Sequence, residues 1–240
     1  MADRYYCDVP ITTDRAELKG PEAHHLLHVI RARVGDRVTL FDGSGCEFPA
    51  VVERLGRADV ELAVLDRVAV DRELPMELVL AVALPKGERQ KWLVEKVVEL
   101  GVARLVPLVT ARGVAQPWGQ AVDRLRRGVI EASKQCGRNR LMEIGFPKAW
   151  PEFLDATEQI PCRWLAHPHT AAGTVVGSGG GWDRGGKSIT LAVGPEGGFT
   201  DEEVAAAVAA GWQTVDLGPR TLRVETAAIA LAALAGHWAV

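Results

Sequence analysis

The spacing of polar and apolar residues divides the chain into two parts. In the first 70 positions it predicts mostly β-structure. Arg37 to Phe41 has the pattern of a short strand, and residues 47–52 and 59–65 alternate loosely, as half-buried strands do. Before them, residues 21–31 have the spacing of a helix. We therefore expect a small barrel-like domain that carries one helix.

From residue 73 onward, predicted strands and helices alternate. Glu77 to Leu84 is a continuous apolar run, which is typical of a strand in a sheet that is covered on both faces. This alternation predicts a mainly parallel sheet, and we place one domain at residues 1–72 and the other at 73–240. The later strands are predicted at 104–109, 163–166, 188–193 and 214–217, and the helices at 88–100, 121–136 and 225–238.

Local signals mark the ends of two helices. Thr200 followed by Glu203 is a capping box, which starts a helix. Gly101 follows the predicted helix 88–100 as its C-cap. The glycine-rich segment 177–186 has the composition of a flexible loop. The apolar spacing of helix 88–100 predicts four inward side chains, Trp92, Leu93, Val97 and Leu100.

Composition narrows the class of protein. No apolar run reaches the roughly 18–20 residues that span a bilayer, and the N-terminus lacks a signal-peptide pattern. The four cysteines lie far apart in the sequence, which favours free thiols in a reducing compartment. We expect a cytoplasmic protein that does not associate with membranes.

Charge is unevenly distributed, although the net charge is only −3. Residues 85–148 carry 13 Lys and Arg against 6 Asp and Glu, a local balance of +7, inside an otherwise acidic chain. Such a basic block is typical of a localised surface that binds a polyanion such as RNA. A solvated helix face with lysines and arginines is the alternative interpretation of the same block.

Two glycine-proline segments near the C-terminus mark a candidate site. Residues 194–199 and 217–226 each follow a strand-like run and lead into a helix-like one. Open α/β sheets bind ligands at the carboxyl ends of their strands, where glycine allows the backbone to approach a ligand closely. The sequence therefore predicts one site built mostly from main chain, with Arg220, Arg223 and Glu225 as its charged groups.

The ligand of this site is predicted to be neutral or cationic. Neither a GxGxxG fingerprint nor a phosphate-binding P-loop is present, which argues against a nucleotide-dependent oxidoreductase. Acidic residues 201–203 open the helix after the first glycine turn and would repel phosphate. S-adenosylmethionine fits, because its sulfonium is positive. His24 and His28 have helical spacing but no third ligand, so we expect no metal.

Several motifs together resemble one enzyme family. The segments GPEGGFTDEE (194–203) and LGPRTLRVETA (217–227) resemble those of the RsmE family of ribosomal RNA methyltransferases, which belong to the SPOUT class. Residues 24–31, 34–36 and 41–43 look like the PUA-like N-terminal domain of that family. Its central motifs are matched by residues 83–89, 95–102 and 131–138.

The resemblance implies a fold and an activity. The fold is an α/β, SPOUT-type parallel sheet with a deep trefoil knot and helices on both faces, behind a small β-barrel PUA-like domain. The activity is S-adenosylmethionine-dependent methylation of uridine N3 in 16S rRNA, within the 30S subunit, by a homodimer. One departure is the sequence Thr110-Ala111-Arg112-Gly113, which keeps the family's arginine without its acidic neighbour. A non-catalytic RNA-binding ribosome-assembly factor is the alternative function.

Together, the motifs and the basic block predict three sets of site residues. Arg223 or Arg220 is expected to stabilise the negative charge that develops on the uridine. Glu225 is either a base, an orienter of Arg223 or simply a favourable helix-start residue. The cofactor is expected to contact Leu165, His167, Gly194, Pro195, Glu196, Gly197, Leu217, Gly218, Leu222, Arg223 and Thr226. RNA is expected to contact Arg31, Arg33, Lys86, Arg89, Arg112, Gln135, Arg138 and Arg140.

Overall fold

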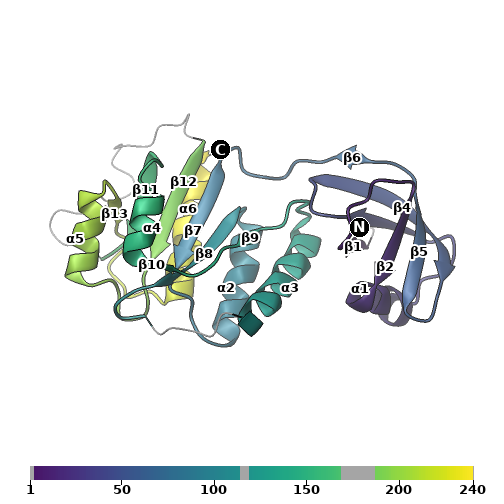
Figure 1. Ribbon diagram of the computed structural model, residues 1–240, viewed down its shortest axis with the longest axis horizontal. Coiled ribbons are helices and arrows are strands. Elements are labelled where there is room, and N and C mark those ends of the chain that lie inside the picture. Colours follow the sequence, from purple (N-terminus) through teal and green to yellow (C-terminus); the bar gives the residue numbers. More distant parts are fainter. Residues whose placement is uncertain (1–2, 114–118, 169–186, 240) are drawn as a thin grey trace. The chain divides into compact units, whose positions relative to one another are not determined.

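The computed structural model describes residues 3–113, 119–168 and 187–239, which form two compact units (Figure 1). The first unit comprises Met1–Glu73 and Ser133–Leu141, and the second comprises Leu74–Ala132 and Met142–Val240. Segment 133–141, which the sequence placed in the second domain, therefore packs with the first unit. The predicted loop 177–186 lies outside the described residues.

The first unit is built on a six-stranded sheet in the order β1-β3-β4-β5-β2, with β6 paired to β4. Only β1 and β3 pair in parallel, and the other neighbours are antiparallel. The predicted strands are confirmed, and β1, β2 and β6 are additional. The strands are β1 (Arg4–Tyr6), β2 (Arg15–Lys19), β3 (Arg37–Phe41), β4 (Cys46–Leu55), β5 (Asp59–Val64) and β6 (Val68–Ala69).

The predicted helix 21–31 consists of two parts. A short α1 (Gly20–His24) leads into η1 (His25–Ile30), a π-helical turn that ends at Arg31 with the left-handed φ of 58°. Positive φ is unusual for a residue other than glycine. Ala23 and Leu26 of these turns pack against the buried apolar side chains of the sheet, so the helical segment covers the core of the first unit.

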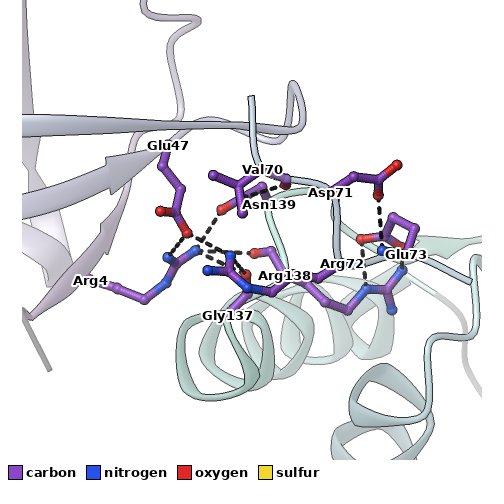
Figure 2. Close-up of polar contacts among 9 residues, drawn as sticks. All are labelled: Arg4, Glu47, Val70, Asp71, Arg72, Glu73, Gly137, Arg138 and Asn139. Carbon is purple, nitrogen blue, oxygen red and sulfur yellow. Dashed lines mark hydrogen bonds and ion pairs between the residues drawn. The ribbon is translucent and has the colours of Figure 1, made fainter. Parts of the chain in front are cut away.

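A polar cluster holds segment 133–141 within the first unit (Figure 2). Glu47 Oε1 accepts hydrogen bonds from Arg4 Nη1 at 2.5 Å and from Arg72 Nη1 at 2.6 Å. Arg4 Nη2 also donates to Asn139 Oδ1 at 2.6 Å, and Arg72 Nη1 to the carbonyl of Gly137 at 2.8 Å. Both arginines thereby connect Glu47 of β4 to the segment that follows α3.

The second unit contains a seven-stranded sheet in the order β10-β8-β7-β12-β11-β13, with β9 beside β8. All of its pairings are parallel, as predicted. Strands β9 and β10 were not predicted, because two residues are too few to show a pattern. The strands are β7 (Glu77–Val82), β8 (Arg104–Val109), β9 (Glu143–Ile144), β10 (Lys148–Ala149), β11 (Cys162–Ala166), β12 (Ser188–Val193) and β13 (Gln213–Val215).

Helices pack against this sheet (Figure 1). Helix α6 (Val224–Ala239) packs on β7 and β12 and also on α2 (Glu88–Glu99). Helices α4 (Trp150–Ala156) and α5 (Asp201–Ala209) pack beside β10 and β13. Helix α3 (Gly119–Cys136) has its last turn in the first unit. Within residues 3–113, 119–168 and 187–239, no helix is long and apolar enough to cross a membrane.

Two of the four predicted inward residues of α2 are not fully buried: Trp92 is exposed, and Leu100, at the C-cap, is half-buried. Trp92 is 45% exposed, whereas Leu93 and Val97 are fully buried as predicted, together with Val94 and Val98. The buried side of α2 is the one that packs on α6, and Trp92 lies outside that stripe. The capping box is confirmed, because Thr200 and Glu203 each accept the hydrogen bond that the motif requires.

Glu47 is the shared anion of two arginines in the polar cluster of Figure 2, so we expect the stability of the first unit to depend on it. Burial opposes ionisation of Glu47, but hydrogen bonds from Arg72 and Arg4 outweigh it and lower its pKa. We expect Glu47→Gln to reduce the free energy of unfolding of the first unit by about 2 kcal/mol at pH 7, because two partly buried guanidinium groups lose their shared anion. Hydrogen exchange of the β3 and β4 amides would measure this loss.

The sign of the pH dependence follows from the lowered pKa. Glu47 contributes stability above its unfolded-state pKa, and that contribution disappears as the pH falls through the folded-state pKa. The difference between wild type and Glu47→Gln should therefore shrink toward pH 3. Glu61→Gln is the matched control, since Glu61 pairs with Arg54 at an exposed site and should matter little. Equal exchange rates in wild type and Glu47→Gln at pH 7 would contradict this assignment.

Candidate cofactor site

A cavity of about 270 Å³ lies at the carboxyl ends of β11, β12 and β13. These three strands are neighbours in the sheet, and Ala166 of β11 pairs in register with Val193 of β12 and Val215 of β13. The three adjacent strands therefore end at the same edge of the sheet, and the segments that follow them form the walls of the cavity. The first turn of α6 closes the cavity through Val224 and Ala227.

The first wall is the glycine turn after β12. A Cβ atom at Gly194 would lie 2.9 Å from the ring of Phe199, so only glycine allows the turn to close on that ring. Phe199 in turn packs on Trp150, with ring centroids 4.7 Å apart. Arg112 Nη1 donates to the carbonyl of Gly197 at 2.9 Å. The turn is thus held by the aromatic core on one side and by Arg112 on the other.

The second wall is the glycine turn after β13. Asp216 Oδ1 accepts a hydrogen bond from the Gly218 amide at 2.8 Å, which is an Asx turn. Gly218 has a φ of 103°, a conformation that side-chain-bearing residues rarely adopt. The amide of His167 donates to the Val215 carbonyl at 3.0 Å and joins the end of β11 to this wall. The Asx turn and this backbone bond fix the second wall.

Most of the predicted cofactor residues line the cavity, and three do not. Leu165 is fully buried in the core beneath the sheet, among Ala192 and Trp212. Arg223 and Thr226 are exposed and do not line it. Sequence position alone could not show which side of the α6 start faces the cavity. The predicted residues that line it are His167, Gly194, Pro195, Glu196, Gly197, Leu217, Gly218 and Leu222.

Sequence reasoning missed other lining residues. Asp216 was detectable, because Asp-x-Gly is a common Asx-turn pattern. The others are apolar or small residues with no chemical signature: Ala166, Pro168, Val193, Gly198, Phe199, Val215, Thr221, Val224 and Ala227. Apolar lining with a few polar groups is typical of small-molecule sites. The lining carries two acidic residues, Glu196, which pairs with Arg89, and Asp216, which can face a cationic ligand.

The charged residues are arranged differently from the prediction. Arg220 lines the cavity. Glu225 is buried, and its ion-pair partner is Arg89 at 3.8 Å, so the structure does not support the hypothesis that Glu225 orients Arg223. Glu225 is also absent from the cavity lining, which argues against a base in contact with the ligand. Arg220 is therefore the cation best placed to act on a bound molecule.

Three of the predicted RNA contacts form ion pairs or hydrogen bonds with other groups of the protein. Arg138 is 3% exposed and forms an ion pair with Glu73 at 2.5 Å, so it is not available to RNA. Arg112 binds the Gly197 carbonyl, and Arg89 pairs with Glu196 and Glu225. Burial argues against the predicted RNA contact of Arg138, because a charge count cannot reveal a buried ion pair, whereas the RNA contacts of Arg89 and Arg112 stay predictions. The predicted RNA contacts that are exposed are Arg31, Arg33, Lys86, Arg112, Gln135 and Arg140.

Both parts of the chain are similar to known RNA methyltransferases. The profile of the RNA methyltransferase domain matches residues 72–236, and that of the RNA methyltransferase PUA domain matches residues 18–65. The chain is 32% identical to ribosomal RNA small subunit methyltransferase E of Synechocystis, over 95% of this chain and 73% of the relative. The chain belongs to the ribosomal RNA small subunit methyltransferase E family.

Solved structures agree with this family. A putative methyltransferase of Legionella pneumophila, determined with bound S-adenosylmethionine, is 31% identical and covers 98% of this chain and 96% of its own, with a TM-score of 0.89. Ribosomal RNA small subunit methyltransferase E of Neisseria gonorrhoeae, also bound to S-adenosylmethionine, is 29% identical, covers 97% and 96%, and has a TM-score of 0.87. Every residue of the cavity described above lies inside the methyltransferase domain match.

Proposed function

We propose that this protein methylates N3 of a uridine in 16S rRNA of the small ribosomal subunit and that S-adenosylmethionine binds in the cavity at the ends of β11, β12 and β13. The observation that carries the proposal is the cavity itself. Three strand ends, two glycine turns and the start of α6 form it within the matched methyltransferase domain. The deep trefoil knot remains a prediction of the resemblance, and the cytoplasmic location and the domain boundaries at 1–72 and 73–240 remain predictions of the sequence, apart from segment 133–141, which packs with the first unit.

The cavity residues fit this cofactor. Apolar side chains such as Val193, Leu217 and Leu222 suit an adenosine, and Glu196 and Asp216 suit positive charge. When bound, S-adenosylmethionine supplies a methyl group on a sulfonium, from which an RNA nitrogen can displace it. Internal hydrogen bonds hold both glycine turns in place, so they would present a fixed surface to the ligand, and an in-line displacement requires such fixed positioning.

Arg220 is the residue that we assign to the reacting base. Uridine N3 is a poor nucleophile until it loses its proton, and the resulting charge spreads to the neighbouring carbonyl oxygens. A guanidinium at the cavity stabilises that charge as the donors of an oxyanion hole do. It does not remove the proton itself, because arginine stays protonated in proteins. Arg223 is the second candidate, as an exposed residue three positions further along the chain.

Mass mapping of rRNA tests the function. In 16S rRNA from cells that lack the protein, we expect one uridine to be missing its methyl group, and purified protein with S-adenosylmethionine should restore it on 30S subunits.

Arg220→Ala should lower kcat by about 10²–10³, the usual effect of losing one oxyanion donor, with cofactor affinity retained. If Arg220→Ala keeps full turnover and Arg223→Ala loses it, the role belongs to Arg223. A protein that binds RNA but not the cofactor would be the assembly factor instead.

RNA binding is assigned to the exposed basic residues of both units. We expect the substitution of Arg31, Arg33, Lys86 and Arg140 by glutamate to weaken binding to rRNA. The salt dependence of the binding constant should become shallower, by about 0.7–0.9 for each phosphate that the variant no longer neutralises. Cofactor affinity, measured by calorimetry, should not change. Arg57→Glu, at another exposed position of the first unit, is the control. Unchanged RNA affinity in the quadruple variant would refute the assignment.

A homodimer is proposed from the composition of α6. This helix is apolar almost all round, and such helices are normally covered on every side. Ala228 and Ala232 are fully buried within the unit, so large residues there would disrupt the core rather than a dimer interface. Ala233 is exposed on the same helix. It is therefore the better probe of the interface.

Light scattering tests the dimer. We expect a dimer mass for wild type and a monomer mass for Ala233→Arg, because an unpaired charge inside an apolar interface is unfavourable. Ala206→Arg, at an exposed alanine of α5, should keep the dimer mass. A wild-type protein that is monomeric at micromolar concentration would show that α6 is not an interface.

A further inference from the structure

Arg89, in the first turn of α2, lies within reach of two acidic residues, one in the lining of the cavity and one in the first turn of α6. Its Nη2 is 3.2 Å from Glu196 Oε1, and its Nη1 is 3.8 Å from Glu225 Oε2. Glu196 belongs to the glycine turn after β12, which is the first wall. Glu225 belongs to the first turn of α6, whose Val224 and Ala227 close the cavity.

We call the ion pairs of Arg89 with Glu196 and with Glu225 the two arms of the Arg89 bridge, and they differ in their exposure to solvent. The Glu196 side chain is 59% exposed, and ion pairs of that kind contribute little by themselves. The Glu225 side chain is only 5% exposed, and its Oε2 accepts no hydrogen bond from the described residues. A buried carboxylate without a donor depends on nearby positive charge, because solvent does not screen it. Arg89 is the cation found there, so the Glu225 arm is the stronger one.

We propose that Arg89 is a positioning residue of the cofactor cavity: it joins the glycine turn at Glu196 to the start of α6 at Glu225 and so fixes the distance between the first wall and α6. This inference rests on the proposed function, which makes the cavity the cofactor site. Helix α2 packs on α6, and this packing places the backbone of Arg89 beside the start of α6. Arg89 therefore acts on cofactor affinity rather than on RNA.

Calorimetric titration with S-adenosylmethionine tests the proposal in the intact protein without RNA. We expect Arg89→Ala to weaken cofactor affinity about tenfold, within the range of measured couplings between contacting residues. Glu225→Gln should weaken it by a similar factor, and Glu196→Gln by less, because that arm is exposed. The double variant of Arg89→Ala and Glu225→Gln should bind the cofactor no more weakly than the worse single variant. If the losses of cofactor affinity in the two single variants add up in the double variant, the proposed link between Arg89 and Glu225 is wrong.

Arg89→Lys and steady-state kinetics separate positioning from a general loss of structure. Lysine keeps the charge but lacks the fork that reaches two carboxylates, so we expect partial recovery of affinity. In Arg89→Ala the KM for the cofactor should rise while kcat stays within about twofold, provided that the variant is folded by circular dichroism. A lowered kcat with unchanged KM would indicate a merely structural role and overturn the proposal.

Two further comparisons complete the test. Arg126→Ala removes an exposed arginine of α3 in the same unit and should leave cofactor affinity unchanged. If Arg89→Ala binds the cofactor normally but binds rRNA more weakly with a shallower salt dependence, Arg89 is an RNA contact and the proposal is wrong. If wild type itself shows no affinity for S-adenosylmethionine, the proposed function fails first.

Discussion

The parallel pairing of β11 between β12 and β13 is the constraint on which the candidate site depends. Ala166, Val193 and Val215 are register partners across these strands, and all three line the cavity. Parallel strands end at the same edge of a sheet, so this register alone brings together segments that are up to 50 residues apart in the sequence. A shift by one residue would turn each lining side chain to the other face of the sheet.

The first wall of the cavity is continuous with the core. Phe199 belongs to the glycine turn and also to the aromatic cluster formed with Trp150, Phe153 and Trp212. Gly194 is required there because Phe199 occupies the space that a Cβ atom would need. Glycine in this turn therefore serves packing, whereas Gly218 serves backbone conformation through its positive φ. Both properties make the main chain available to a ligand and leave few side chains free to move.

Sequence reasoning predicted the elements of the second unit better than their environment. The continuous apolar run from Glu77 to Leu84 identified the buried strand β7, and the glycine turns identified the strand ends that form the site. Spacing could not predict that Trp92 lies outside the buried stripe of α2 or that Leu165 points into the core. It also could not place segment 133–141 in the first unit. These features depend on contacts between distant parts of the chain, which a local pattern does not contain.

The basic block shows why a charge count overstates a binding surface. Within residues 85–148, Arg138 neutralises Glu73, Arg104 pairs with Glu143, and Arg112 holds a turn of the cavity. Arg138 is buried, so its charge contributes little to the field that an RNA phosphate experiences, whereas Arg104 and Arg112 are exposed and keep their charges at the surface. Part of the local balance of +7 therefore fixes the cavity and its neighbouring segments, and only the remainder is available for the RNA binding that we propose. Only the burial and the partner of each side chain tell the two apart.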